Sequence, residues 1–520
     1  MRRQIVLLLV LFSLEVFAQA PKAVQKKSPS STAIKPKLVV AIIVDQFRYD
    51  YLLRFAGEYK EGIRQLLSKG AVFTNARYNH FPTFTAVGHA AFLTGAFPSA
   101  TGIVGNQWYD RFSGKIIRSA SDDSVQLLGV AGPGSSPRNL LASSVGDELK
   151  MAGSGQSRVI GISIKDYSAI LASGHAADGA FWYDGRNGHF VSSTYYFPDL
   201  PSWVKEFNAR RPADRFKGAE WGGNKLPAEA NSQFYASLPG SPFGNDLVEE
   251  MAEAAVRGEM LGRHAFADLL FLSFSSNDYV GHQYGPDAPQ VREITRETDR
   301  LLGRLFKFLD QQIGMANVLV VFAADHGIGP TAETNAARRM PGGRVGFAAM
   351  RDTIQKALSG KYGEGKWIAS TPEEAIYLNW DLIKSKKLTL AEVTQEAEQA
   401  LVAMPHVFRV YTRERLLNGF SMNDQLGRRV MNSFSPTRGA DLYVILDPYY
   451  LFGSFIANHG TPHGYDTHVP LVFMGPGIAA GKYHASVEIN DVAPTLSTIL
   501  GIEIPSNSEG RILSEIFAAP

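Results

Sequence analysis

The sequence predicts an α/β protein, a three-layer sandwich in which helices flank a central, mostly parallel β-sheet, with cap insertions. Apolar runs rich in β-branched residues recur along the chain, and amphipathic helical patterns lie between them. Several of the runs end abruptly at an Asp or a Lys. Strands that alternate with helices over hundreds of residues are typical of a sheet covered on both faces.

Five apolar runs have the length and composition of buried strands. In chain order they are KLVVAIIV (37–44), SRVIGISI (157–164), ADLLFLSFS (267–275), ANVLVVFAA (316–324) and VPLVFMG (469–475). The clearest helix covers residues 289–314, where apolar side chains recur at near-helical spacing. These side chains are Val291, Ile294, Leu301, Leu305 and Leu309.

Residues 38–520 are expected to form one catalytic domain that carries two insertions. The segment at about 180–260 is rich in Trp, Tyr, Gly, Pro and Asn, and the segment at about 335–455 has less regular α/β patterning. Both are expected to build a cap over the site. In a parallel sheet ligands bind beyond the carboxyl ends of the strands, so the polar residues that follow strands are the candidates for function.

The N-terminus has the pattern of an export signal. Residues 1–20 combine two arginines, a short apolar stretch and an Ala-Gln-Ala ending, which predicts a cleaved signal peptide. The apolar stretch is short for an uncleaved anchor, the alternative interpretation. Residues 21–37 are rich in Pro and Ser and carry five lysines and no acid, as expected of a flexible linker.

These features predict a periplasmic or secreted monomer without a membrane span. The sequence contains no cysteine, which agrees with export and excludes disulfides, thiolate metal ligands and a cysteine nucleophile. The formal net charge is +2, but basic residues are concentrated in the first 37 positions, so the folded body is mildly acidic. A broad basic surface for nucleic acid is therefore not expected.

Several Asp and His residues follow the predicted strands or lie in polar loops. They are Asp45, Asp278 with His282, adjacent Asp325 and His326, and the pair His459 and His463. The spacing of Asp278 and His282 places both on one helical face. Each residue alone could be a helix cap, a turn former or a structural histidine. Together they predict a cluster of ligands at one edge of the sheet.

Carboxylate and imidazole ligands without sulfur suit two divalent ions, with zinc the preferred metal. Two such ions can stabilise the attacking and the leaving oxygen of an in-line displacement at phosphorus or sulfur. Thr85 lies in HFPTFTAVGHAAFLTG (80–95), between a proline-marked turn and a helix start. We expect it to be the nucleophile, because a metal ion and a helix N-terminus both favour its alkoxide. An N-cap role for Thr85 is the alternative, and Thr83 is a rival nucleophile.

Taken in order, these motifs resemble a known family. They are VVAIIVDQFR, HFPTFTAVGHAAFLTGAFPSATGIVGNQWYD, SIKDYSAI, FSSNDYVGHQYGP, VVFAADHG, HGTPHGYDTHVPLVFMGPG and DVAPTLSTILGI. The set resembles the alkaline phosphatase superfamily, especially the phosphate-irrepressible (PafA-type) bacterial enzymes, and is related to the nucleotide pyrophosphatase/phosphodiesterases. The resemblance runs from about residue 38 to the C-terminus.

The resemblance implies a metal ligand set and a mechanism. One zinc ion would be held by Asp278, His282 and His459. The second would be held by Asp45, Asp325, His326 and the Thr85 oxygen. The implied reaction has two steps, because Thr85 attacks phosphorus and water later hydrolyses the phosphothreonine. His463, in HGYD, resembles the ligand of the phosphodiesterase branch, and His459 is preferred over it.

Three further residues are expected to contact the phosphoryl group. By the resemblance, Asn106 in GIVGNQW donates to a phosphate oxygen, and Lys165 in SIKDYSAI helps to neutralise a monoester dianion. A turn asparagine and a surface lysine are the alternatives. The family usually has an arginine where this sequence has Tyr167. A neutral phenol offers less to a dianion than a guanidinium, which puts monoester preference in question, whereas Lys165 still favours monoesters.

The sequence thus predicts an exported two-zinc phosphatase that hydrolyses small phosphate monoesters. A phosphodiesterase or nucleotide pyrophosphatase with the same metal site is the alternative. Sulfatase activity is disfavoured, because the nucleophile segment lacks the Cys/Ser-x-Pro-x-Arg pattern of that group. A non-catalytic envelope protein, binding through the aromatic segment FWYDGRNGHF (181–190), is also disfavoured because the Thr, Asp and His set is complete.

Overall fold

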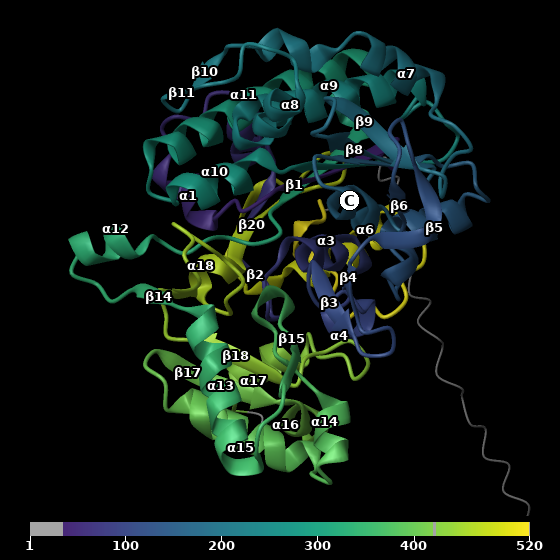
Figure 1. Cartoon of the computed structure of the whole chain (residues 1–520). Coiled ribbons are helices and arrows are strands. Elements are labelled where there is room, and N and C mark those ends of the chain that lie inside the picture. Colours follow the sequence, from purple (N-terminus) through teal and green to yellow (C-terminus); the bar gives the residue numbers. More distant parts are fainter. Residues whose placement is uncertain (1–34, 420–422, 519–520) are drawn as a thin grey trace, which may run out of the picture. The chain divides into compact units, whose positions relative to one another are not determined.

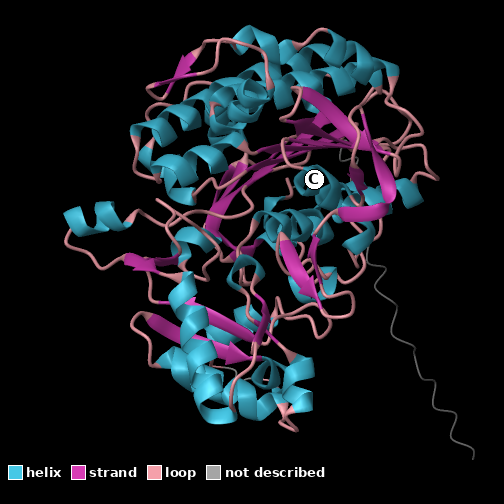
Figure 2. Cartoon of the chain, in the orientation of Figure 1, coloured by secondary structure: helices cyan, strands magenta, loops and turns pink. Residues whose placement is uncertain are grey.

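A computed structural model describes residues 35–419 and 423–518 of the chain. Twelve of the described strands form one sheet, and helices cover both of its faces (Figures 1 and 2). The strand order is β21 (Gly481–Tyr483), β2, β20, β13, β1, β12, β7, β8, β9, β5 and β6, and β22 (Val487–Glu488) pairs with β2. The predicted α/β sandwich with a mostly parallel central sheet is confirmed.

The centre of the sheet is parallel and is built from the predicted strands. β7 (Val159–Ser163), β12 (Asp268–Phe274), β1 (Leu38–Val44) and β13 (Val318–Ala323) are neighbours in that order. Val44 pairs with Phe274, and Ile43 pairs with Ala323, so these strands end at the same level. The fifth predicted strand, β20 (His468–Met474), pairs antiparallel with β13.

Two layers of helices flank this sheet. On one face lie α2 (Gly62–Lys69), α9 (Pro242–Gly258), α10 (Ser276–Tyr284) and α11 (Pro289–Gln312). On the other lie α3 (Thr85–Thr94), α5 (Val145–Ala152), α6 (Asp166–Ser173) and α19 (Val492–Leu500). The helix expected over 289–314 is α11, and its five apolar residues are all buried.

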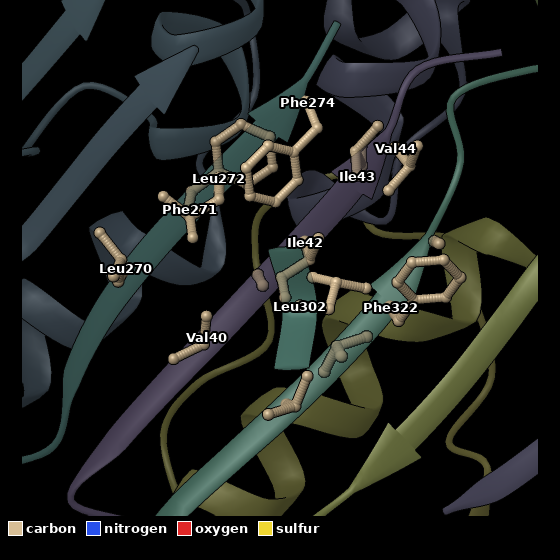
Figure 3. Packing of buried hydrophobic residues seen from close by; sticks show 14 of the residues in the cluster. Val40, Ile42, Ile43, Val44, Leu270, Phe271, Leu272, Phe274, Leu302 and Phe322 are labelled. Carbon is tan, nitrogen blue, oxygen red and sulfur yellow. The ribbon is translucent and has the colours of Figure 1, made fainter. Parts of the chain in front are cut away.

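The central strands are apolar on both sides because both faces are covered. Every residue of β1 and of β12 is buried (Figure 3). Figure 3 shows Ile42 and Phe322 of neighbouring strands close to Leu302 of α11, and all three are fully buried. Burial of one such side chain contributes about 1.5–3 kcal/mol relative to exposure. The strand positions are therefore fixed by packing above and below the sheet.

The segment at about 180–260 packs into the main body of the protein. It begins with β8 (Gly179–Asp184) and β9 (His189–Ser193), which are strands of the central sheet. Its later apolar residues, such as Phe207 and Phe234, belong to the main core. The aromatic segment 181–190 was considered as a binding face, but Phe181, Trp182, Tyr183 and Phe190 are buried. The segment therefore does not present an exposed aromatic face, because Phe181, Tyr183 and Phe190 pack in the main core and Trp182 packs in a smaller cluster.

The segment at about 335–455 has a hydrophobic core of its own. α13 (Phe347–Tyr362) and α15 (Leu390–Val402) pack together, and β17 (Val407–Thr412) pairs with β18 (Leu442–Leu446). Trp367 is fully buried among their apolar side chains. The two segments with irregular patterns thus have different structural roles.

Shorter elements complete the surroundings of the site. They include β2 (Ala71–Arg77), the hairpin of β3 (Gln107–Asp110) and β4 (Lys115–Arg118), β5 (Ser121–Leu128), β6 (Pro133–Ser135) and α18 (Gly464–Thr467). No helix within the described residues is long and apolar enough to cross a bilayer. The predicted signal peptide (1–20) and most of the predicted linker (21–37) lie outside the described residues.

Candidate active site

The four parallel central strands deliver one polar residue each to the same edge of the sheet. Lys165 follows β7, Asp278 lies in the first turn of α10 after β12, Asp45 follows β1, and Asp325 follows β13. Because these strands are adjacent, parallel and in register, their carboxyl ends must lie side by side. We call this place the carboxyl edge. Lys165 Nζ donates to Asp45 Oδ2 (2.7 Å) and to Asp278 Oδ2 (2.8 Å).

Two groups of side chains at the carboxyl edge have the spacing of metal ligands. Asp278, His282 and His459 form the first group, and Asp45, Asp278 and His326 form the second. In each group the ligand atoms lie within 4.8 Å of one another. Asp325, expected in the second group, lies beside it, with Oδ2 3.4 Å from His326 Nε2.

The three histidines are oriented in the same way. The Nδ1 atoms of His282, His326 and His459 hydrogen bond to the carbonyl oxygens of Ala457 (3.0 Å), Gly327 (2.9 Å) and Thr83 (2.8 Å). A carbonyl only accepts, so each Nδ1 carries a proton, and in the neutral ring Nε2 is left with a lone pair. Such backbone contacts hold the ring of a metal-ligating histidine in place.

Burial keeps two of these imidazoles neutral, which is the form that binds metal. It lowers the pKa of His459 to about 3, with help from His282, and it lowers the pKa of His326 well below the usual range, with help from His459. The rings of His326 and His459 stack with centroids 3.6 Å apart. For His282 the neighbouring Asp278 outweighs burial and raises the pKa.

The carboxylates are crowded and only partly neutralised. Burial, followed by the nearby Asp325, raises the pKa of Asp45 well above the usual range, and burial raises the pKa of Asp325 to about 7. Burial also acts on Asp278, but Lys165 and His282 outweigh it and hold the pKa low. Asp45 Oδ1 and Asp325 Oδ2 are buried without a hydrogen-bond partner among the described residues. Such oxygens, together with neutral imidazoles, fit divalent cations.

Thr85 is the first residue of α3, and its hydroxyl faces this cluster. Thr85 Oγ1 lies 3.2 Å from His326 Nε2 and 3.5 Å from Lys165 Nζ. Phe84, and not Thr85, occupies the N-cap position of α3, so the hydroxyl is not used as a cap. The helix approaches closely because residue 88 is glycine, since a Cβ there would lie 2.4 Å from the backbone oxygen of Asp325. The rival Thr83 donates its hydroxyl to the Thr461 carbonyl (2.9 Å).

Asn106 and Tyr167 lie around Thr85 and Lys165. Asn106 Oδ1 accepts from the N–H of Ala86 (2.8 Å), the residue after Thr85, which leaves its amide N–H groups for other partners. Tyr167 is partly buried, and burial raises its pKa against the opposing effect of Lys165, so its phenol stays neutral. Lys165 is therefore the cation in contact with Thr85 Oγ1.

The second histidine of the HGTPHG motif has a different environment. His463 Nε2 contacts the Leu446 carbonyl (3.1 Å), and its ring lies 5.5 Å from the ring of Tyr465. Neither group of ligand-spaced side chains within the described residues contains it. The ring of His459, in contrast, lies 5.0 Å from that of His282.

Four residues at the site were not anticipated from the sequence. Gln46 Nε2 donates to Asp278 Oδ1 (2.6 Å), His89 Nδ1 donates to the Thr85 carbonyl (2.8 Å), and the Tyr279 ring lies 5.4 Å from Lys165 Nζ. Each is adjacent to, or on the same helix as, a predicted residue, which is the only signal the sequence offers. The fourth, Glu373, comes from the 335–455 segment and accepts from the N–H of Asn106 (2.9 Å).

Two hollows adjoin the cluster. An apolar pocket next to His459 is lined by side chains that include Phe84, Tyr377 and Phe452, with Glu373 among the few polar ones. A second, more polar groove is lined by residues that include Lys165, Tyr167, Tyr279 and Trp182. The site thus combines candidate ligands for cations, a hydroxyl, a lysine and two adjoining hollows.

Comparison with known proteins places this arrangement in a family. The family model for type I phosphodiesterase/nucleotide pyrophosphatase matches residues 39–466. The chain is 34% identical to alkaline phosphatase PafA of Elizabethkingia meningoseptica, covering 93% of this chain and 94% of that protein. It is 33% identical to alkaline phosphatase PhoV of Synechococcus elongatus, with 96% of each chain covered.

The fold agrees with these matches. The crystal structure of PafA superimposes with a TM-score of 0.87 at 33% identity, over 93% of this chain and 99% of that one. Murine ectonucleotide pyrophosphatase/phosphodiesterase 5 shares the fold, with a TM-score of 0.56 at 16% identity over 92% of this chain and all of that one. The resemblance expected from the motifs is confirmed: this protein belongs to the type I phosphodiesterase/nucleotide pyrophosphatase family.

Proposed function

We propose that this protein is an exported phosphatase that hydrolyses small phosphate monoesters through a phosphothreonine on Thr85, with two zinc ions as cofactors. Family membership and the likeness to alkaline phosphatases support phosphoric ester hydrolysis. The observation that carries the proposal is the position of Thr85 Oγ1, which lies within 3.5 Å of both His326 Nε2 and Lys165 Nζ at the carboxyl edge.

The ligand assignment follows the two groups of side chains. Asp278, His282 and His459 would hold one cation. Asp45, Asp325 and His326 would hold the other, together with the Thr85 oxygen. When bound, two divalent ions would supply electrostatic stabilisation of the attacking and leaving oxygens. The backbone contacts of the three histidines support this role, because they aim each Nε2 at the carboxylates.

The chain's own residues prepare Thr85 for attack. Its position in the first turn of α3 favours negative charge on Oγ1, because the free N–H groups of a helix start create a positive potential. Lys165 adds a positive charge 3.5 Å away. In the first step Thr85 Oγ1 forms a bond to phosphorus while the bond to the ester oxygen breaks. In the second step water attacks phosphorus, and the Thr85 oxygen leaves.

Recognition of the phosphoryl group falls to Asn106 and Lys165. An asparagine amide can donate to a non-bridging oxygen without adding charge, whereas a lysine neutralises part of a dianion. Tyr167 supplies at most one neutral hydrogen bond. With Tyr167 in place of the family arginine, Lys165 is the cation that contacts Thr85. Less positive charge stabilises a monoester dianion less, so the preference for monoesters over diesters is expected to be modest.

A phosphodiesterase is the second candidate, and the neutral phenol of Tyr167 favours it. The discriminating measurement compares kcat/KM for a phosphate monoester and a diester that share one aryl leaving group, with zinc-loaded protein. A kcat/KM for the monoester that exceeds that for the diester supports the monoesterase. A kcat/KM for the monoester well below that for the diester assigns the protein to the diesterases. A protein that turns over neither substrate, with zinc or with other divalent metals, would contradict both candidates.

The covalent step can be tested directly. We expect that acid quenching during turnover of an aryl phosphate traps a phosphorylated peptide that contains Thr85, found by mass spectrometry. Phosphate on Thr83, or on no residue, would contradict the assignment.

Export is tested separately by sequencing the N-terminus of protein recovered from the periplasm or medium. Cleavage after Ala20 is expected, and a protein that keeps Met1 would contradict a cleaved signal.

A further inference from the structure

Glu373, from the 335–455 segment, hydrogen bonds to the backbone of the loop carrying Asn106. It lies in a short 3-10 turn, Pro372–Glu374, that breaks from helical geometry at this residue. Its backbone is left-handed, with φ 47° and ψ 42°. A non-glycine residue in that region costs of the order of 1 kcal/mol, and such strain persists where surrounding contacts enforce it.

The carboxylate of Glu373 is received by a backbone loop shaped to fit it. Glu373 Oε2 accepts from the N–H of Asn106 (2.9 Å) and from that of Gln107 (3.4 Å). The preceding residue is Gly105, where a Cβ would lie only 2.8 Å from Glu373 Oε2. Glycine therefore leaves room for the carboxylate to reach both N–H groups.

These contacts hold Asn106 in place from several directions. Its Oδ1 accepts from the N–H of Ala86, which directly follows Thr85 (2.8 Å), and its backbone oxygen accepts from the N–H of Ser119 (2.8 Å). Glu373 adds the third contact, to the Asn106 N–H. The Asn106 side chain also hydrogen bonds to Glu373. An amide nitrogen has two N–H donors, so the other one remains for a phosphoryl oxygen.

The carboxylate of Glu373 is buried and is stabilised mainly by its hydrogen bonds. Burial raises the pKa of Glu373 to about 7, and hydrogen bonds from Asn106 and Gln107 offset part of that shift. Both residues are neutral. A carboxylate placed in such surroundings costs stability unless hydrogen bonds compensate, so its contacts with the Asn106 loop are its main compensation.

We propose that Glu373 is a positioning residue, which fixes Asn106 so that its amide faces the phosphoryl group on Thr85. The inference rests on the proposed phosphatase function and extends it, because it makes the 335–455 segment a functional part of the site. Without Glu373 the loop at 105–107 would lose one of the three partners that hold Asn106, and the Asn106 donor would spend less time in the productive geometry.

A double-mutant cycle tests the inference with zinc-loaded full-length protein. The variants are Glu373→Ala, Asn106→Ala and the pair, and kcat/KM is measured on an aryl phosphate. Glu373→Ala is expected to lower kcat/KM by roughly ten- to a hundredfold, since misplacement of a donor costs that much. In the Asn106→Ala background the same change is expected to cost less than about twofold, because the residue that Glu373 positions is gone.

Matched variants and a second readout separate positioning from general damage. Glu373→Gln keeps an acceptor oxygen and is expected to recover most of the loss, whereas Glu364→Ala, an exposed carboxylate of the same segment, should have no effect. Hydrogen exchange at the Asn106 and Gln107 amides should become faster in Glu373→Ala. Circular dichroism and urea unfolding report whether each variant is folded.

The outcomes that overturn the inference are distinct from failure of the proposed function. Parental kcat/KM in Glu373→Ala, or an equal loss in both backgrounds, overturns the positioning role alone. A parental kcat/KM in Asn106→Ala overturns both the role of Asn106 and this inference. Unchanged amide exchange at residues 106 and 107 in a folded Glu373→Ala variant also overturns it.

Discussion

The carboxyl edge of the central sheet and the 335–455 segment contribute to the site in different ways. The edge supplies Lys165, Asp278, Asp45 and Asp325 from four adjacent parallel strands, whose positions are fixed by helices on both faces. The 335–455 segment has a core of its own around Trp367, and it contributes Glu373 and the pocket side chains Tyr377 and Phe452 to the site. The candidate metal-binding carboxylates thus follow strands that are buried on both faces, whereas a segment with a separate core contacts the backbone of Asn106.

Loss of the nucleophile tests the edge most severely. Thr85→Ala is expected to lower kcat by on the order of a thousandfold or more, because no other hydroxyl occupies that position. Metal content, measured by mass spectrometry of the intact protein, should stay close to the parental value. Thr85→Ser keeps a hydroxyl and serves as the control, with a much smaller loss. Parental turnover in Thr85→Ala would remove Thr85 from the mechanism.

Removal of metal tests the same edge through stability as well as activity. Chelation is expected to abolish turnover and to lower the melting temperature, since a ligand at a hundred times its Kd stabilises a protein by about 2.7 kcal/mol. Stability should fall because the crowded carboxylates of Asp45 and Asp325 would then be only partly neutralised, by Lys165. Added zinc should restore both signals. Full activity in excess chelator, or no shift in melting, would contradict the metal site.

A core change in the 335–455 segment sharpens the contrast. Trp367→Ala should cost about 3–5 kcal/mol, because it removes a fully buried side chain. Leu417→Ala, at an exposed position of the same segment, is the control and should cost little. We expect the 335–455 segment to unfold at a lower urea concentration than in the parent. We also expect kcat/KM to fall roughly tenfold, because the segment would hold Glu373 less firmly beside Asn106. A loss as large as that of Thr85→Ala would mean that the two regions are not functionally distinct.

A charge change next to Lys165 should have a smaller effect. Tyr167→Arg is expected to raise kcat/KM for a monoester by about tenfold and that for a diester by less, because added positive charge favours the dianion. Tyr167→Phe is the matched control and should leave the ratio of the two rates nearly unchanged. An equal gain on both substrates would show that residue 167 does not sense the substrate charge.

The last prediction is a pH dependence of stability at Glu373. Its pKa in the folded protein is about 7, against a usual 4.5, so ionisation is harder when the protein is folded. The parent should therefore lose stability, relative to Glu373→Gln, as pH rises from 4.5 through about 7. Urea unfolding of both proteins at about pH 5 and about pH 8 measures this difference. A difference that does not grow with pH would contradict the raised pKa.

Candidate site residues could be predicted from the sequence where they directly follow an apolar strand. Asp45, Lys165 and Asp325 directly follow continuous apolar runs, and a parallel sheet must bring such positions together, so their convergence was predictable. His459 was a choice between two similar motifs, and the structure brings it, not His463, next to Asp278 and His282. The roles of these residues in catalysis remain predictions for the experiments above.

The structural roles of residues 180–260 and 335–455 were less predictable. The hydrophobic pattern of a segment is similar whether it packs into the main core or forms a core of its own. Residues 180–260 and 335–455 both look irregular in sequence, yet Phe207 is in the main core and Trp367 lies in a separate one. Glu373 had no local signal at all. Its partner Asn106 is 267 positions away, and a single carboxylate in a turn is typical of a solvated surface.

The central strands, the residues that follow them and the family could all be predicted from the amino-acid sequence, because each depends on neighbouring residues or on ordered motifs. The contacts between side chains outside those motifs could be found only in the folded protein. Contacts such as those of Glu373 with Asn106, or of Gln46 with Asp278, depend on how separate elements pack, and packing is set by the shapes of all neighbouring side chains at once.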